Sequence, residues 1–364
     1  MPISEENFLN LPNKFIDARL QCDGDILVSA KIERGRQERP LWHRMERLKP
    51  DEMLIWVDRF DSACPIASEW ALAQALEDSM GLILPERMQF VRTMLCELNR
   101  LVWLTTYLGR MTATLGQKTL SQQVFILREH VFVMQEELTG GRILPQALRL
   151  GGCRREFAMG DEQKTRRFLE NWKTFWKQWL DLVTDDPLLE SRLKNLLAIP
   201  SGMIESLGWW GIVGKASSVC YDSRKHRPHG AYPHLNFTIP RRDRGDAGSR
   251  FEVVIEEVEL TLSLLDQLLQ TIPKSDGSIK AGPASGSQGP ELKPGFYFGC
   301  SESAKGPVIA AVEINNDGHV TTLRLFATGQ RVWPCIDPLF HSIRAEDFQV
   351  AFTSLGVDSE EAEI

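Results

Sequence analysis

The sequence contains no pair of cysteines spaced as C-x-x-C. Its seven cysteines stand singly along 364 residues. Structural zinc sites and iron–sulfur clusters are usually held by closely spaced thiolates, so we expect this chain alone to hold neither. The odd number and the scatter also argue against a disulfide framework. We interpret the cysteines as single buried thiols.

Three other features are missing. No apolar run approaches the ~20 residues that a membrane-spanning helix needs, and the acidic N-terminal segment lacks the apolar centre of a signal peptide. There is no excess of basic residues, because the net charge is −7 and the pI is about 5.6. A general nucleic-acid-binding protein has the opposite balance. These absences predict a cytoplasmic protein that reaches any membrane through its partners.

The sequence does contain enough apolar residues for a large core, since 43% of it is apolar and 25% charged. Two segments carry apolar residues at steps of three and four, which places them on one helix face. The first series is Met88, Val91, Leu95, Leu98 and Val102, and the second runs from Leu120 to Leu138. Pro85 before the first and Gly140-Gly141 after the second are start and stop signals. The pattern predicts an antiparallel helix pair within the core.

Shorter signals outline the rest of the chain. Residues 13–33 predict a β-hairpin with its turn at Asp23-Gly24, and Pro65 starts a helix. Further helices are expected over residues 162–197, with a break at Asp186-Pro187, and over 249–272. The Gly-, Pro- and Ser-rich residues 273–294 predict a linker, followed by two strands over 307–314 and 319–326.

These elements predict a mostly helical α+β fold. We divide the chain into an N-terminal β-hairpin region (1–40), a helical core (41–272), the linker (273–294) and a small sheet with a C-terminal segment (295–364). Aromatic residues at helical steps within 162–197 are interpreted as core, with a subunit interface as the alternative. They are Phe168, Trp172, Phe175 or Trp176, and Trp179.

Two segments suggest a ligand site. The glycine-rich residues 208–217 lack the first glycine of a phosphate-binding loop and the hydroxyl residue after Lys215, so we reject a nucleotide site there. His226, His229 and His234 form the one histidine cluster, and neutral imidazoles bind zinc or copper. The nearby cationic side chains would repel a metal ion. We keep a metal site here as the weaker alternative.

An ordered set of motifs carries a resemblance to a known family. It comprises DRFD at 58–61, Glu69, ILPERMQFVRTMLCELNRL at 83–101, Thr105-Thr106, Arg128-Glu129, TGGR at 139–142 and LRLGG at 148–152. In order and spacing these segments resemble the D-type subunit of NADH:quinone oxidoreductase (respiratory complex I), a relative of [NiFe]-hydrogenase large subunits. The resemblance extends from about residue 18 to 358. It implies the hydrogenase large-subunit fold, with a helical core, an N-terminal β-hairpin and a small C-terminal sheet.

The resemblance also implies a role for Arg44. The segment from Trp42 to Arg47 looks like the family's H-R-G-x-E motif, with Met45 in place of glycine. In the family this arginine lies beside the terminal iron–sulfur cluster of a neighbouring subunit, where a cation favours the reduced cluster. Without the family, the segment is typical of a solvated basic helix face.

The family's proton-donating groups for quinone reduction are altered in this chain. Its H-P-x-x-H-G loop is absent, with Asn13-Lys14 at about that place. Its tyrosine corresponds to Ser62, and its histidine–aspartate pair corresponds to Tyr107 and Arg110. Because one positioned proton donor typically contributes ~10²–10⁴-fold, the changes argue against the usual ubiquinone chemistry. The two C-x-x-C pairs of the hydrogenases are missing as well, which excludes a nickel–iron centre.

Two hypotheses follow. In the first, the chain is a divergent D-type subunit on the cytoplasmic side of a membrane complex, peripheral to the membrane and docked against an iron–sulfur subunit. Quinone would bind at this interface, with Ser62 and Tyr107 in the pocket and Arg44 facing the partner's cluster. The chain alone would bind no cofactor, and NADH would be bound and oxidised elsewhere in the complex. In the second, it is a redox-silent structural or coupling subunit of a complex I-like or hydrogenase-like membrane complex.

Overall fold

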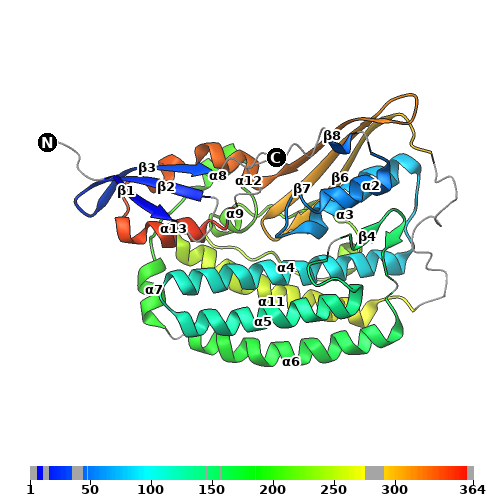
Figure 1. Cartoon of the computed structure of the whole chain (residues 1–364). Coiled ribbons are helices and arrows are strands. Elements are labelled where there is room, and N and C mark those ends of the chain that lie inside the picture. The colour runs from blue at the N-terminus through cyan, green and yellow to red at the C-terminus, as the bar shows by residue number, and fades with distance from the viewer. Residues whose placement is uncertain are drawn as a thin grey trace.

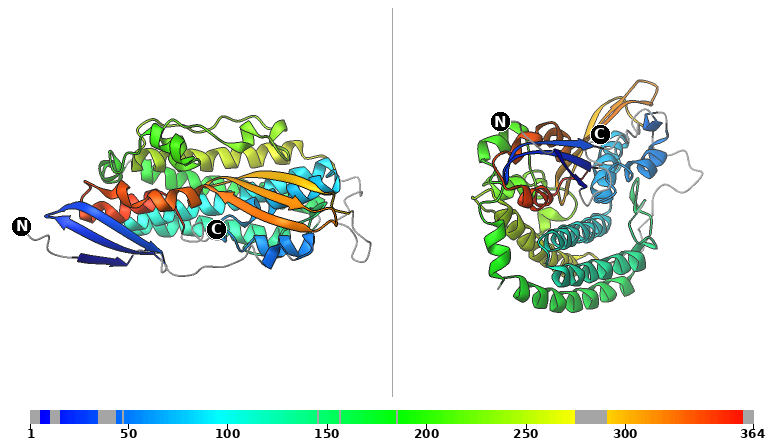
Figure 2. Two further views of the ribbon diagram at one scale, coloured as in Figure 1. Left: turned by 90° about the horizontal axis from the view of Figure 1, so that it is seen from above. Right: turned by 60° about the vertical axis from the view of Figure 1, so that its left-hand side comes forward.

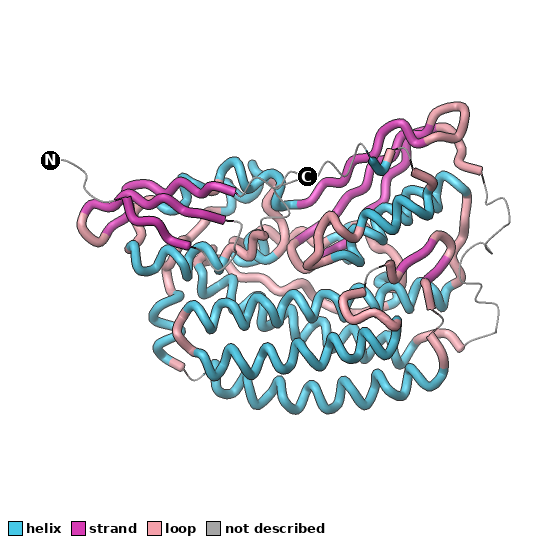
Figure 3. The backbone as a smooth tube through the Cα atoms, in the orientation of Figure 1, coloured by secondary structure: helices cyan, strands magenta, loops and turns pink. Residues whose placement is uncertain are grey.

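The computed structural model describes residues 6–10, 16–34, 44–46, 48–144, 146–155, 157–184, 186–274 and 291–358. Long helices lie side by side in one half of the molecule, and two small sheets lie over them (Figure 1). The tube in Figure 3 separates the helical half from the strands. The predicted mostly helical α+β fold is confirmed.

Helices α4 (Glu86–Thr114), α5 (Lys118–Thr139), α6 (Met159–Thr184) and α11 (Ala247–Thr271) form the main core. Helix α4 packs against α5 and α11, and α5 also packs against α6. The predicted signals hold, since α4 begins directly after Pro85 and α5 ends at Gly140, whose φ is +77°. Helix α4 is buried on most sides, and its buried residues include charged side chains such as Arg92, Glu97 and Arg100 as well as apolar ones.

The predicted aromatic stripe of α6 belongs to the core. Trp172 and Trp179 are buried, and their indole N–H groups donate to the carbonyls of Leu127 and Leu120 on α5 at 3.0 and 2.9 Å. Of the two residues that could continue the stripe, Trp176 does so, because Trp176 is buried whereas Phe175 is 49% exposed. The backbone carbonyls of α5 thus satisfy the buried indole N–H groups of Trp172 and Trp179.

Shorter helices connect these elements. They are α2 (Pro50–Val57), α3 (Pro65–Met80), α7 (Pro187–Leu193), α8 (Ser201–Leu207), α9 (Ile212–Ala216), α10 (Ser223–His226), α12 (Thr328–Val332) and α13 (Phe348–Ser354). The predicted break at Asp186-Pro187 is confirmed, because Asp186 caps α7 by accepting from the backbone N–H of Leu188 at 2.9 Å. No helix in the described ranges is both long and apolar enough to cross a bilayer.

The predicted N-terminal hairpin is present as β2 (Ile16–Asp23) and β3 (Ile26–Arg34), with Gly24 in the turn at a φ of +60°. The prediction of two strands was incomplete, because β1 (Glu6–Asn10) pairs antiparallel with β2. Figure 2 shows this sheet at one end of the molecule. Asn13-Lys14 lie outside the described residues.

A second antiparallel sheet has the order β6-β7-β8. The predicted strands are β7 (Gly306–Ile314) and β8 (Val320–Ala327), and the unpredicted third strand is β6 (Gly295–Ser303). Helix α3 packs closely under it, since a Cβ on Gly299 would meet the carbonyl oxygen of Ala71 at 1.8 Å. A two-residue ribbon, β4 (Leu148–Arg149) with β5 (Gly152–Cys153), lies near α3 and α4. The domain divisions remain a prediction, and linker residues 275–290 lie outside the described residues.

Candidate functional site

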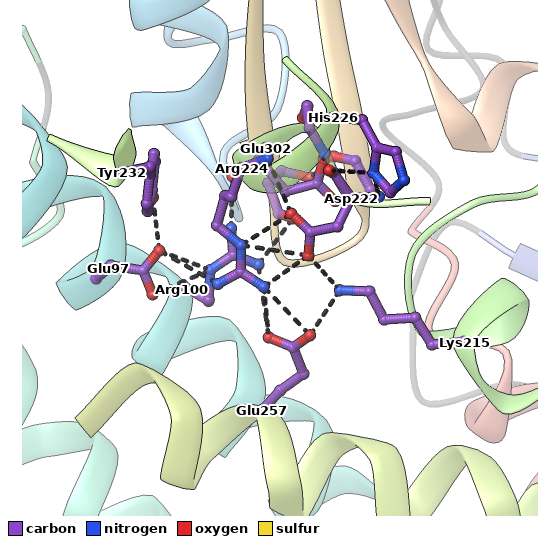
Figure 4. A network of polar contacts seen from close by, with 12 residues as sticks. Glu97, Arg100, Lys215, Asp222, Arg224, His226, Tyr232, Glu257 and Glu302 are labelled. Atoms are coloured by element: carbon purple, nitrogen blue, oxygen red, sulfur yellow. Dashed lines mark hydrogen bonds and ion pairs between the residues drawn. The ribbon is translucent and has the colours of Figure 1, made fainter. Parts of the chain in front are cut away.

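A buried ionic network lies where α4, α9, α10, α11 and β6 meet (Figure 4). Its ionisable side chains are Glu97 and Arg100 from α4, Lys215 from α9, Asp222 and Arg224 at α10, Glu257 from α11, and Glu302 from β6. Each of these residues is at most 2% exposed. Buried charges persist only when they are paired and hydrogen-bonded, so their partners decide the chemistry.

Arg224 is the centre of the network. Its guanidinium lies 2.7 Å from Asp222, 3.0 Å from Glu257 and 3.4 Å from Glu97. The Lys215 Nζ joins two of the same carboxylates, at 2.7 Å from Asp222 and 2.5 Å from Glu257. Burial opposes the charge of Asp222, but Arg224 and Lys215 hold its pKa well below the usual range. The same cations lower the pKa of Glu257 to about 2 against its burial.

Helix α4 ties the network to the end of β6. Arg100 donates to the carbonyl oxygens of Ser303 and Glu302 at 3.0 and 2.7 Å. Glu97 accepts from the hydroxyl of Tyr232 at 2.6 Å, so the loop after α10 is held as well. Burial and the adjacent Glu97 raise the pKa of Tyr232 well above its usual value, which keeps the hydroxyl a donor.

Glu302 differs from the other carboxyl groups of the network. Its Oε2 accepts from the backbone N–H of Ser223 at 2.8 Å and from the Ser223 hydroxyl. Burial and the neighbouring Asp222 raise the pKa of Glu302 to about 7, although Lys215 and Arg100 act in the opposite direction.

A second group of charges, which we call the Lys305 cluster, lies nearer the surface and comprises Asp61, Lys305, Asp358 and Arg110. The Lys305 Nζ is 2.9 Å from Asp61 and 3.4 Å from Asp358, and Arg110 is 3.2 Å from Asp358. Lys305 and Asp61 are nearly buried, whereas the Arg110 side chain is 52% exposed. The cluster therefore brings the turn between β6 and β7, the end of α4 and the C-terminal segment to one place.

The backbone of this turn fits its surroundings tightly. A Cβ on Gly211 would meet the carbonyl oxygen of Lys305 at 2.1 Å, and the φ of Gly211 is +75°. Only glycine meets both requirements. Gly211 belongs to the glycine-rich segment 208–217, which lacks the pattern of a phosphate-binding loop. Lys215 of the same segment pairs with carboxylates inside the protein.

Both predicted pocket residues lie close in sequence to members of the Lys305 cluster. Ser62 follows Asp61 and is exposed. Tyr107 lies one helical turn before Arg110 but is 3% exposed, and its hydroxyl donates to the carbonyl of Ser354 at 2.9 Å. The structure thus gives the Tyr107 hydroxyl an internal partner, whereas Ser62 lies at the surface.

Arg44, the predicted cluster-facing residue, is also exposed. Its neighbour Met45 is buried in the core under the second sheet, and Glu46 accepts from the backbone N–H of Leu323 in β8 at 3.3 Å. Arg44 is therefore anchored beside β8 rather than on the Lys305 cluster. His43 lies outside the described residues.

The three histidines face different rings. His226 stacks on Tyr221 at 5.0 Å between ring centroids, His229 meets Trp70 edge-on at 4.7 Å, and His234 stacks on Phe90 at 5.8 Å. Within the described parts of the chain, no group of three or more histidine, cysteine, aspartate or glutamate side chains could hold a metal ion. All seven cysteines are free thiols.

Sequence reasoning missed Lys305, Asp358 and Glu302 as site residues. They lie in or near segments without a periodic pattern, and a charged residue in such a segment gives no sign of burial. The one available signal was Glu97 with Arg100, an acidic and a basic residue three positions apart within the apolar stripe of α4.

Comparisons with known proteins agree on one family. The model of the 49 kDa subunit of respiratory-chain NADH dehydrogenase matches residues 114–357. The D-type subunit of the NADH-quinone oxidoreductase of Prosthecochloris aestuarii is 27% identical over 352 residues, covering 90% of this chain and 88% of that protein. The corresponding Campylobacter curvus protein is 27% identical over 328 residues, covering 84% of this chain and 80% of the relative.

A solved structure shows the same fold. A chain of the membrane-bound sulfane sulfur reductase, an archaeal respiratory membrane complex, superposes with a TM-score of 0.92 over 100% of both chains, at 24% sequence identity. This likeness concerns the fold alone.

Proposed function

The chain belongs to the 49 kDa subunit family of respiratory-chain NADH dehydrogenase, and from that premise we propose that it is a D-type subunit of a membrane-associated NADH:quinone oxidoreductase. In this role it binds no redox cofactor by itself. It docks against an iron–sulfur subunit on the cytoplasmic side of the membrane, and the quinone headgroup lies between the two subunits.

The observation that carries this proposal is the Lys305 cluster beside Ser62. A quinone oxygen gains negative charge as electrons arrive from the partner's iron–sulfur cluster. Arg110 presents a half-exposed guanidinium at the rim of the cluster, and the nearly buried Lys305 ammonium shares the Asp358 carboxylate with it. Preorganised cations in a partly buried site stabilise such charge far more than the same cations in water do.

A substitution at Ser62 tests the pocket. Ser62→Trp would fill the headgroup position, so we expect a loss of quinone reduction on the order of 10²-fold in the tagged complex from solubilised membranes. Ser206→Trp, at an exposed serine on α8, is the matched control and should leave turnover unchanged. Normal turnover in a fully assembled Ser62→Trp complex would contradict the pocket.

The second candidate function is a redox-silent structural or coupling subunit. The altered proton-donor positions favour it, as does the Tyr107 hydroxyl, which is bound to the Ser354 carbonyl. Arg44→Ala separates the two functions. If Arg44 faces the partner's cluster, its loss should lower the cluster's reduction potential, because a nearby cation stabilises the reduced form. An unchanged potential, or a complex without iron, would favour the structural role.

A further inference from the structure

The buried ionic network contains unequal numbers of acidic and basic groups. Three cations, Arg100, Lys215 and Arg224, face four carboxyl groups, Glu97, Asp222, Glu257 and Glu302. An uncompensated carboxylate in such a site is strongly disfavoured, and a buried acid normally neutralises itself by holding a proton. The composition of the network therefore requires one proton at neutral pH.

The contacts identify the carboxyl group that holds this proton. Glu97, Asp222 and Glu257 each lie within ion-pair distance of at least one cation. By contrast, the Glu302 Oε2 accepts from the uncharged Ser223, and the Glu302 Oε1 is a buried oxygen without a hydrogen-bond partner among the described residues. A protonated carboxyl group is uncharged and needs no cation beside it. The proton therefore belongs on Glu302.

We propose that Glu302 is a proton-holding residue of this subunit, and that its protonation positions Lys305 against Asp61 in the Lys305 cluster. The first half rests on the network alone, and the second rests on the proposed function for its effect on turnover. Glu302 is thus a positioning residue that acts through the turn between β6 and β7.

The link from Glu302 to Lys305 is short and hydrogen-bonded. Arg100 holds the carbonyls of Glu302 and Ser303, and the backbone N–H of Lys305 donates to the Ser303 hydroxyl at 3.1 Å. That hydroxyl donates in turn to the carbonyl of Gly306 at 2.8 Å. A negative charge on Glu302 would compete for the Arg100 guanidinium, which fixes the start of this turn.

Titratable groups on every surrounding element contribute to the state of Glu302. Asp222 at α10 disfavours its ionisation, whereas Lys215 on α9 and Arg100 on α4 favour it. Nearby are also Cys96 on α4, Cys300 on β6 and Tyr221 before α10, and burial raises the pKa of each, which keeps them neutral. The Arg227 cation after α10 acts on both Cys300 and Tyr221. The opposing charges place the pKa of Glu302 at about 7, in support of the contact analysis.

Carbon-13 NMR of the full-length chain with labelled glutamate carboxyl groups tests the proton directly. We expect a carboxyl resonance that titrates with a midpoint near pH 7 and that Glu302→Gln removes. Burial also raises the pKa of Glu69, so Glu69→Gln is used to identify the resonance of that residue. Glu313→Gln is the matched control, because Glu313 lies on β7 of the same sheet and contacts Thr322 at 2.8 Å, and it should leave that resonance in place. If every glutamate other than Glu69 titrates below pH 5, or if Glu302→Gln removes no neutral-pH resonance, the assignment is overturned.

A pH profile of quinone reduction by the assembled complex tests the positioning role. Glu302→Gln keeps a neutral side chain at every pH, so its turnover should stay constant between pH 6 and 8, where that of the unmodified complex falls several-fold. Identical profiles would overturn the coupling to Lys305. The NMR titration uses no quinone, so a complex that fails to reduce quinone would reject the proposed function and leave the proton assignment standing.

If Glu302→Gln does not fold, Glu302→Asp replaces it. This variant should move the neutral-pH midpoint without removing the resonance, and a midpoint unchanged by the shorter side chain would overturn the assignment.

Discussion

Arg224→Met removes the central cation of the buried network and should destabilise the protein strongly. Arg224 is 1% exposed and lies within 3.4 Å of three carboxylates. Its loss leaves four carboxyl groups with two cations, and breaking a buried ion pair by removing one partner costs about 3–5 kcal/mol. We expect the free energy of unfolding to fall by about that amount at pH 8.

The effect should depend on pH in a defined direction. Without Arg224, the pKa values of Asp222 and Glu257 rise in the folded state, so the folded variant binds more protons than the folded unmodified protein does, while the unfolded chains bind the same number at these two groups. The loss of stability is therefore largest at high pH and shrinks as the pH falls and these groups take up protons. Denaturant unfolding at pH 6 and pH 8 measures both the loss of stability and its dependence on pH.

Lys225→Met is the matched control, because Lys225 follows Arg224 but is exposed, with its Nζ 4.0 Å from the centroid of the Phe237 ring. It should lose about 1 kcal/mol or less. An Arg224→Met variant that loses no more than this control, or that loses the same amount at both pH values, would refute the ionic account of the network.

Three further substitutions test local geometry. Gly230→Ala and Gly24→Ala share a similar left-handed φ of +55° and +60°, but only at Gly230 would the new Cβ approach Trp70, at 2.5 Å. Backbone strain should lower the free energy of unfolding of both variants by about 1 kcal/mol. The clash should lower that of Gly230→Ala by about 1–3 kcal/mol more, measured as a lower denaturant midpoint. Equal losses in the two variants would rule out the clash. Tyr107→Phe leaves the Ser354 carbonyl without the hydroxyl that donates to it, so the free energy of unfolding should fall by about 1–2 kcal/mol while quinone turnover stays unchanged. Lost turnover in a stable variant would instead place the Tyr107 hydroxyl in the reaction.

The long helices could be predicted because their apolar residues recur with the helical period. Strand β6 could not, because its sequence GFYFGCSES contains glycine and serine, which disfavour strands on average. Its position is fixed by tertiary contact instead. Gly299 lies against the backbone of α3, and β7 supplies the paired edge. A strand that is specified by its neighbours leaves little trace in its own residues.

The site was predictable only where a family motif marked it. Ser62 and Tyr107 were proposed through the resemblance and remain predictions; in sequence they lie next to Asp61 and three residues before Arg110 of the Lys305 cluster. The histidines illustrate the opposite case, because residues spaced within nine positions turned to three different aromatic rings. Spacing in the sequence predicts which side chains meet only when the backbone between them is regular, and the chain from His226 to His234 contains just a short 3-10 turn at Tyr232–His234.

The buried network also explains how the long irregular segment from 217 to 246 is held in place. Between α9 and α11 this segment forms only α10 and one 3-10 turn. It therefore has few regular backbone hydrogen bonds and must be fixed by side chains. Asp222 and Arg224 attach its start to Lys215 and Glu257, while Tyr232 attaches its middle to Glu97. The same ion pairs thus fix the segment and create the unequal charge that leaves a proton on Glu302, so a purely structural network and a proton-holding one differ in the titration of that single carboxyl group.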